Sequence, residues 1–151
     1  MVEYPFLLSE FRAILKKRGF KFTKQRELVL QALYENEGHF SPEEILALVR
    51  NRLPKIKIGI ATIYRTLSLL EEEGLAYSIS LGRDGKRYEL GLKTHHDHLV
   101  CVECGRIIEF FDEVIEKRQE DVAKEFNFLM QEHIMQIRGL CSSCQNQNRE
   151  E

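Results

Sequence analysis

The sequence lacks the signals of a secreted or membrane-spanning protein. Its first residues, MVEYPFLLSEF, contain no basic leader and no apolar core followed by a small-residue cleavage site. No apolar run in the 151 residues is long enough to span a bilayer. We therefore expect a cytoplasmic location. In a reducing cytosol, four cysteines in two CxxC pairs favour zinc binding over disulfide bonds.

The sequence also lacks common catalytic motifs. It contains no nucleophile elbow, no phosphate-binding loop and no HExxH helix. A small metallohydrolase remains an alternative, because His96, His98 and a carboxylate can hold a metal that keeps an open position for water. A domain of about 50 residues leaves little room for a substrate pocket, so we expect that the protein is not an enzyme. A further alternative is a zinc-stabilised module that binds only protein.

A strong net charge is missing from the chain as a whole, but the two halves carry net charges of opposite sign. The formal net charge of −2 and the pI near 6.2 argue against indiscriminate binding to nucleic acid. Residues 1–91 contain 15 Lys and Arg against 12 Asp and Glu, whereas residues 92–151 contain 7 against 12. The N-terminal half is therefore the part suited to meet phosphate groups.

Short amphipathic helices are predicted in the N-terminal half. The apolar spacing indicates three of them, over residues 8–18, 23–34 and 42–53. The third has a strong start signal, because Ser41 and Glu44 can form a capping box and Pro42 stands at the first helical position.

A fourth helix is predicted over residues 60–73, and a two-stranded hairpin follows it. The apolar side chains of this helix fall on one stripe, which comprises Ile60, Ile63, Leu67 and Leu70. Polar side chains lie off that stripe, namely Thr62, Arg65, Thr66 and Ser68. Strand-like runs over residues 75–81 and 86–90 flank the turn GRDG. Several helices followed by a basic hairpin predict a winged helix-turn-helix.

The polar face of the fourth helix is a candidate DNA-binding surface. Most such faces are simply solvated, but here Tyr64 and Arg65 stand among threonines, including Thr62. Basic residues precede the helix and occupy the hairpin, namely Lys55, Lys57, Arg83, Lys86 and Arg87. Guanidinium can pair with guanine, threonine and tyrosine can contact thymine, and lysine can meet phosphate. We therefore predict binding to double-stranded DNA.

The C-terminal half has a different pattern of elements. Strands are predicted over residues 99–102, 106–111 and 130–137, and a helix over residues 112–126. The fold class is therefore α+β, with an N-terminal winged-helix domain at residues 1–90, a hinge at 91–94 and a second, metal-binding domain at 95–145. The tail at residues 146–151 is expected to be disordered.

The two CxxC pairs predict one closed zinc site made by Cys101, Cys104, Cys141 and Cys144. A redox role is conceivable for either pair alone but not expected for both. The 36 residues between Cys104 and Cys141 mean that zinc would tie the first hairpin of the domain to the end of the chain. Structural zinc can supply on the order of 10 kcal/mol of apparent folding free energy. Removal of this zinc should therefore unfold the second domain.

The histidine-rich run before the first CxxC pair predicts two further groups of metal ligands. If residues 95–100 are extended, alternation sends His96 and His98 to one face and His95 and Asp97 to the other. Glu109 can join the face with Ile107 and Phe111. Two residues on the following helix and strand can reach the group of His95 and Asp97, namely Glu116 and His133.

Five runs of the sequence together carry a family resemblance: HFSPEE, GIATIYRTLSLLEEEGL, RYEL, HHDHLVCVECGRIIEF and the terminal CSSC. They resemble the ferric uptake regulator family of metal-dependent repressors, and the motifs are specific in combination. The resemblance implies a transcriptional repressor that acts as a homodimer on palindromic operators, with the C-terminal α/β domain as the dimerisation domain. Association of dimers into higher oligomers stays open.

The resemblance also assigns roles to individual residues. It implies a regulatory metal site that joins the two domains, formed by His39, Glu89, His96, His98 and Glu109. It implies a third metal site in the dimerisation domain, formed by His95, Asp97, Glu116 and His133. The four cysteines match the structural zinc site of the family. Lys21, Tyr64 and Arg65 match family positions that contact DNA.

The identity of the regulatory metal follows only weakly from the residues. Three imidazoles and two carboxylates suit Fe²⁺, Mn²⁺, Co²⁺ or Zn²⁺. A zinc-sensing relative would more often bring a thiolate into the site, and all four cysteines are committed elsewhere. A peroxide-sensing relative would more often have aspartates at the positions of Glu89 and Glu109. We therefore expect ferrous iron, with manganese, zinc and peroxide sensing as alternatives.

Overall fold

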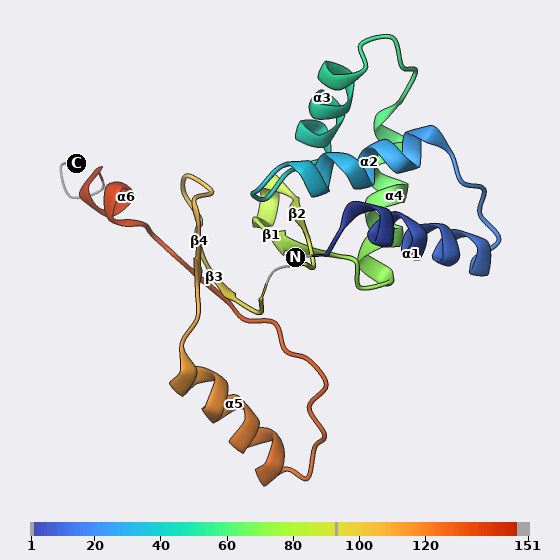
Figure 1. Cartoon of the computed structure of the whole chain (residues 1–151). Coiled ribbons are helices and arrows are strands. Elements are labelled where there is room, and N and C mark those ends of the chain that lie inside the picture. The colour runs from blue at the N-terminus through green and yellow to red at the C-terminus, as the bar shows by residue number, and fades with distance from the viewer. Residues whose placement is uncertain (1, 93, 148–151) are drawn as a thin grey trace. The chain divides into compact units, whose positions relative to one another are not determined.

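The computed structural model describes residues 2–92 and 94–147, shown in Figure 1. The chain divides into two compact units, Met1–Lys93 and Thr94–Glu151. Both contain helices and strands, which confirms the predicted α+β class. None of the helices in the described ranges combines the length and apolar character needed to cross a membrane.

The first unit begins with four helices, α1 (Tyr4–Lys17), α2 (Lys24–Glu35), α3 (Pro42–Arg52) and α4 (Ile60–Glu72). The predicted caps are confirmed, since Thr23 accepts a hydrogen bond from the amide of Arg26 and the Ser41 capping box is complete. Helix α1 begins four residues earlier than predicted, because Leu7 extends its buried stripe by one turn.

The apolar core of the first unit takes side chains from all four helices and from the hairpin. Its largest members include Leu7, Phe11, Leu30, Ile45, Ile63, Leu67, Leu70 and Tyr88. Thr66 is also buried, although we predicted it off the apolar stripe of α4. It lies three residues after Ile63 and four before Leu70, so it shares their face, and its hydroxyl donates to the carbonyl of Thr62 at 2.8 Å.

The hairpin of the first unit consists of β1 (Ala76–Ser80) and β2 (Lys86–Leu90), paired antiparallel with Ser78 opposite Tyr88. A short 3-10 turn, η1 (Gly82–Asp84), joins them where the turn was predicted. Phe40 forms an isolated antiparallel bridge to Tyr88, with both backbone hydrogen bonds at 2.8–2.9 Å. The residues just before α3 are thereby attached to the outer edge of β2.

The second unit is built on a three-stranded sheet with the order β4-β3-β5. Strand β3 (Asp97–Cys101) pairs antiparallel with β4 (Ile107–Phe110) and parallel with β5 (Gln136–Gly139). Helix α5 (Glu113–Glu125) follows β4, and α6 (Ser142–Gln147) follows β5. The two helices lie beyond opposite ends of this sheet, as Figure 1 shows.

Two predicted elements of the second unit were wrong. The last strand was predicted over residues 130–137 but spans Gln136–Gly139, because only this part of the crossover reaches β3 to form a parallel ladder. Asn146 and Gln147 were assigned to a disordered tail but belong to α6, which begins directly after Cys141 and buries Cys144. Residues 148–151, the rest of that tail, lie outside the described residues.

Replacing Ser41 with alanine should destabilise the first unit. The Ser41 hydroxyl accepts a hydrogen bond from the Glu44 amide at 3.2 Å, and this bond would be lost. We expect the free energy of unfolding to fall by about 1 kcal/mol, measured by urea denaturation followed by far-UV circular dichroism. Ser9→Ala, at an exposed position inside α1, is the matched control. Equal stability of the two variants would contradict the capping role.

Candidate metal centres and DNA-binding surface

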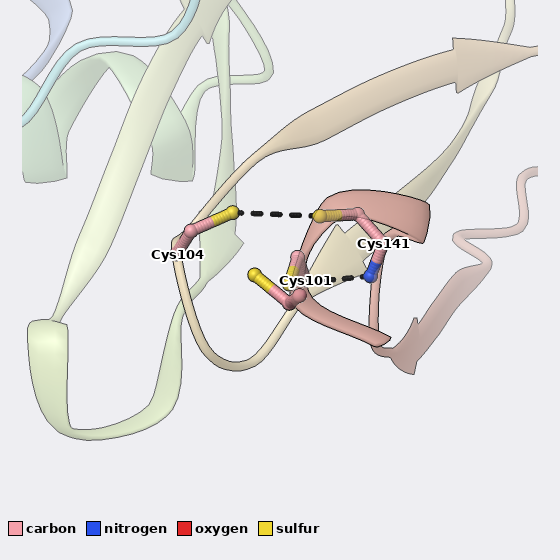
Figure 2. A group of neighbouring side chains, drawn as sticks. Cys101, Cys104 and Cys141 are labelled. Atoms are coloured by element: carbon pink, nitrogen blue, oxygen red, sulfur yellow. Dashed lines mark hydrogen bonds between the residues drawn. The ribbon is translucent and has the colours of Figure 1, made fainter. Parts of the chain in front are cut away.

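The four cysteines gather at one end of the sheet in the second unit. Cys101 ends β3, Cys104 lies in the turn before β4, and the second pair lies at the start of α6. Their Sγ atoms all lie within 4.8 Å of one another, and the Sγ atoms of Cys104 and Cys141 are 3.8 Å apart. Figure 2 shows these two sulfur atoms facing each other.

The spacing of the sulfur atoms fits one tetrahedral zinc ion. Two thiolates bound to the same zinc at about 2.3 Å would lie about 3.8 Å apart, which is the distance between Cys104 and Cys141. A disulfide would need about 2.05 Å, and all four cysteines are free thiols. Four thiolates fill a tetrahedral shell, so the cluster suits a structural ion without an open position.

Backbone amides favour the thiolate form of two cysteines in this cluster, which is the form that binds a cation. The amides of Cys104 and Cys141 donate toward Cys101 Sγ and lower the pKa of that thiol to about 6. The backbone at Cys144 lowers the pKa of Cys141 in the same way. A hydrogen bond to Cys141 and burial raise the pKa of the Cys144 thiol to about 12. Zinc binding would release the remaining thiol protons, since thiolates are the ligands.

A second group of donors lies at the other end of β3. It comprises His95 and Asp97 at the start of the strand, Glu116 on α5, and His133. Both imidazole Nε2 atoms lie 3.2 Å from Glu116 Oε1, and His95 Nε2 is 3.5 Å from Asp97 Oδ1. His133 was expected on a strand, but it stands in the irregular segment before β5.

Asp97 provides the test of whether this second group fits a metal ion. Its side chain is 1% exposed, and neither carboxylate oxygen accepts a hydrogen bond from the described part of the chain. Burying a carboxylate without donors costs several kcal/mol. A divalent cation held by two imidazoles and two carboxylates would remove this cost, so the donor set fits a metal.

Three of the predicted regulatory ligands lie together on the opposite face of the sheet, with His98 on β3, Glu109 on β4 and His96 just before β3. His98 lies directly across from Glu109 in the β3–β4 ladder, and His98 also lies beside His96, with ring centroids 4.7 Å apart. His96 Nε2 is 3.5 Å from Glu109 Oε1. The other ring nitrogen of His96, Nδ1, donates to the carbonyl of Thr94 at 2.9 Å. This bond leaves Nε2 as the nitrogen available to a metal.

The first unit holds the other two predicted regulatory ligands side by side. The bridge between Phe40 and Tyr88 places His39 opposite Glu89, and His39 Nε2 is 3.1 Å from Glu89 Oε2. Both side chains are largely buried, at 10% and 5% exposure. The structure therefore brings the five residues together as a pair in the first unit and a trio in the second.

One residue near the His39 pair had a role that sequence reasoning missed. Arg87 was grouped with the basic residues of the hairpin, but its Nη1 atom donates to the carbonyl of His39 at 3.2 Å and to Glu44 Oε2 at 3.3 Å. The predicted capping box placed the Glu44 carboxylate at the start of α3, but no sequence signal indicated that β2 lies beside it.

Helix α4 presents the predicted DNA-binding side chains to solvent. Tyr64 is 46% exposed, Arg65 is exposed and Thr62 is half-buried. The Tyr64 hydroxyl donates to Glu43 Oε1 at 3.1 Å, which raises the pKa of Tyr64 and fixes the ring orientation. Glu43 was not predicted to take part. Lys21 is exposed in the segment between α1 and α2.

A model of the family described as the ferric uptake regulator family matches residues 17–138. The Campylobacter jejuni ferric uptake regulation protein is 48% identical over 146 residues, covering 97% of this chain and 93% of that protein. The structure of the Helicobacter pylori ferric uptake regulator, described as revealing three functional metal binding sites, is 38% identical with a TM-score of 0.83, covering 95% of each chain.

A third relative is the Francisella tularensis ferric uptake regulator, whose structure was solved with iron. It is 33% identical, covers 84% of this chain and 96% of its own, and has a TM-score of 0.72. The likeness thus extends across both units. The chain belongs to the ferric uptake regulator family.

Proposed function

We propose that this protein is a ferrous-iron-dependent repressor of iron-uptake genes that binds double-stranded DNA as a homodimer. The observation that carries the proposal is the division of the regulatory ligands. His39 and Glu89 lie on the unit with the winged helix, while His96, His98 and Glu109 lie on the unit with the cysteine cluster. Six residues separate Glu89 from His96 in the sequence, so one metal can bind both groups.

A shared metal would act by restricting the angle between the two units. The ion would supply only coordination bonds to nitrogen and oxygen atoms. The two units of the chain would convert this binding into a change in DNA affinity. In a symmetric dimer, the angle sets the separation of the two α4 helices, which must match major grooves about 34 Å apart or a multiple of it. Arg65 and Tyr64 would then reach base edges, with Thr62 beside them and Lys21 near the minor groove.

Ferrous iron is the regulatory metal that best fits the donors and the relatives. Three imidazoles and two carboxylates without a thiolate suit Fe²⁺, although Mn²⁺, Co²⁺ and Zn²⁺ can occupy the same ligands. Glutamates rather than aspartates at positions 89 and 109 argue against peroxide sensing. Relatives from Campylobacter jejuni and Helicobacter pylori, 48% and 40% identical, are named for ferric uptake regulation.

Exposed apolar side chains of the second unit support our proposal that it forms the dimer. Leu99, Ile108 and Ile137 face each other across the three strands and are 36%, 41% and 46% exposed. Further exposed apolar side chains lie on α5 and after it, namely Val122, Phe126, Phe128, Leu129 and Ile134. Monomeric proteins rarely expose apolar patches beyond a few hundred Å², so a second copy of the chain would cover this surface.

The other two donor groups would have supporting roles in the same protein. The cysteine cluster would hold structural Zn²⁺. The group of His95, Asp97, Glu116 and His133 would hold a third metal that ties α5 to the sheet. Both assignments follow the chemistry of the donors, and the Helicobacter pylori relative is described as having three functional metal sites. The cysteine site leaves no open position for substrate, and the chain belongs to a family of regulators, so we propose that the protein is not an enzyme. We also propose a cytoplasmic location, where the protein would meet DNA.

Removing the structural zinc should unfold the second unit and spare the first. The described second unit buries few apolar side chains, whereas the first has its own core. For Cys104→Ser we expect loss of bound zinc and of the dimer, measured by metal analysis and sedimentation. Far-UV circular dichroism should retain a melting transition from the first unit. Ser143→Ala, beside the cluster but not a thiol, is the control. A Cys104→Ser protein with a folded, dimeric second unit would contradict the structural assignment.

Replacing His96 with alanine should weaken metal-dependent DNA binding without dissociating the dimer. The variant removes one ligand from the trio on β3. We expect iron to raise the affinity of the wild-type protein for a palindromic operator by about 5- to 150-fold. This gain should largely disappear in the variant, as measured anaerobically by fluorescence anisotropy at fixed salt.

Arg65→Ala is the companion variant, because it should lose operator affinity but keep its affinity for metal. Arg65 is exposed on α4 and lies outside all three donor groups. If the His96→Ala protein responds to iron as the wild type does, the proposed regulatory site is wrong. If no metal changes DNA binding by the wild-type protein, the proposed repressor mechanism is wrong.

A further inference from the structure

We infer that Arg87 is a positioning residue that holds the metal ligand His39 in place and is not a phosphate contact of the hairpin. The inference rests on the proposed function in one respect, namely that His39 binds the regulatory metal. It assigns to Arg87 a role different from the one that its place in a basic wing suggests.

The backbone geometry around Tyr88 explains why Arg87 can act on His39. Phe40 and Tyr88 exchange both backbone hydrogen bonds, at 2.9 and 2.8 Å, so they form a closely bonded antiparallel pair. His39 then stands opposite Glu89. Side chains two apart on a strand point to the same face, so Arg87 shares a face with Glu89 while Tyr88 points into the core.

The guanidinium of Arg87 ties together the short segment that carries His39. Its Nη1 atom donates to the His39 carbonyl at 3.2 Å and to Glu44 Oε2 at 3.3 Å. The same Glu44 oxygen accepts the amide of Ser41 at 2.8 Å. One charged group therefore connects the residue before Phe40, the start of α3 and strand β2. In the described residues, the Phe40 bridge is the one pairing of this segment with a strand.

The charge of Arg87 is already engaged, which argues against a phosphate contact. Its side chain is 34% exposed and pairs with Glu44. Binding a phosphate would compete with this carboxylate and with the His39 carbonyl. The other arginine of the hairpin, Arg83, differs in this respect. It is exposed in η1 and forms no recorded ion pair within the described ranges.

Loss of the Arg87 hydrogen bonds should therefore increase the mobility of His39 in the metal-free protein. Gly38, which precedes it, has φ of 129°, so the chain turns sharply just ahead of the ligand and needs support after the turn. Residues that hydrogen-bond to a metal ligand and orient it typically contribute 10- to 100-fold to metal affinity. We expect a change of this size for Arg87.

The test compares Arg87→Ala with the matched control Arg83→Ala. Both variants remove one positive charge from the hairpin, but only the first removes the bonds to His39 and Glu44. With the cysteine site filled with zinc, Mn²⁺ is titrated against operator anisotropy. We expect the Mn²⁺ concentration at half-maximal binding to rise about 10- to 100-fold for Arg87→Ala and by clearly less for Arg83→Ala, which can lose operator affinity but removes no bond to His39.

The salt dependence of DNA binding separates the two roles of Arg87. At saturating Mn²⁺, the slope of log affinity against log salt should be the same for Arg87→Ala and wild type. Loss of a phosphate contact would instead reduce the slope by about 1. A reduced slope with an unchanged Mn²⁺ midpoint would overturn the inference and return Arg87 to the DNA interface.

Hydrogen exchange of the metal-free protein tests the same inference without metal or DNA. The amides of Phe40 and Ser41 should exchange faster in Arg87→Ala than in wild type and Arg83→Ala, while amides inside α4 should be unaffected. Equal exchange in all three proteins would overturn the inference. If wild type shows no response to Mn²⁺ or iron, the proposed function fails, but the exchange result still decides the structural role of Arg87.

Discussion

Alternation of side chains along β3 is the constraint on which the metal chemistry of the second unit depends. A strand sends successive side chains to opposite faces, so adjacent residues of the run HHDH serve different donor groups. His98 faces Glu109, whereas Asp97 faces the side of Glu116 and His133. Cys101 ends the same strand and begins the cysteine cluster. A shift of one residue in the register of β3 would exchange the faces and dismantle both histidine groups at once.

The two units obtain their stability in different ways. The first has a continuous apolar core, built from four helices and the hairpin. The second has few buried apolar side chains, and none of the residues of α5 is buried. Such a small unit needs bonds from metals or a partner chain to compensate for the conformational entropy lost on folding. Cysteine ligands at one end of the sheet and histidine and carboxylate ligands at the other meet this need, and the exposed apolar face suits a partner.

Ion pairs with glutamates decide which basic side chains of the hairpin remain available to bind DNA. Glu44 pairs with Arg87 and Glu71 pairs with Lys86, so two of the three basic hairpin residues are engaged within the protein. Glu43 holds the hydroxyl of Tyr64 on α4. The two adjacent glutamates at the start of α3 thus contact the hairpin beside the His39 pair and the helix that would read DNA. Their position follows from the capping box that begins α3.

Much of the molecule was predictable from the sequence, because it depends on local periodicity and spacing. The helix caps, the hairpin turn and the two faces of the histidine run all follow from residues close to one another in the chain. The pairing of the two CxxC motifs, separated by 36 residues, was predicted from the four ligands that a closed zinc site needs. Sequence reasoning missed helix α6 and the burial of Thr66, although Thr66 has the helical spacing from Ile63 and Leu70 that places it on their face. Only the tertiary structure decided the short β5 and the bonds of Arg87 and Glu43, since a strand forms only where it meets a partner and a charged side chain takes the acceptors that packing places within reach.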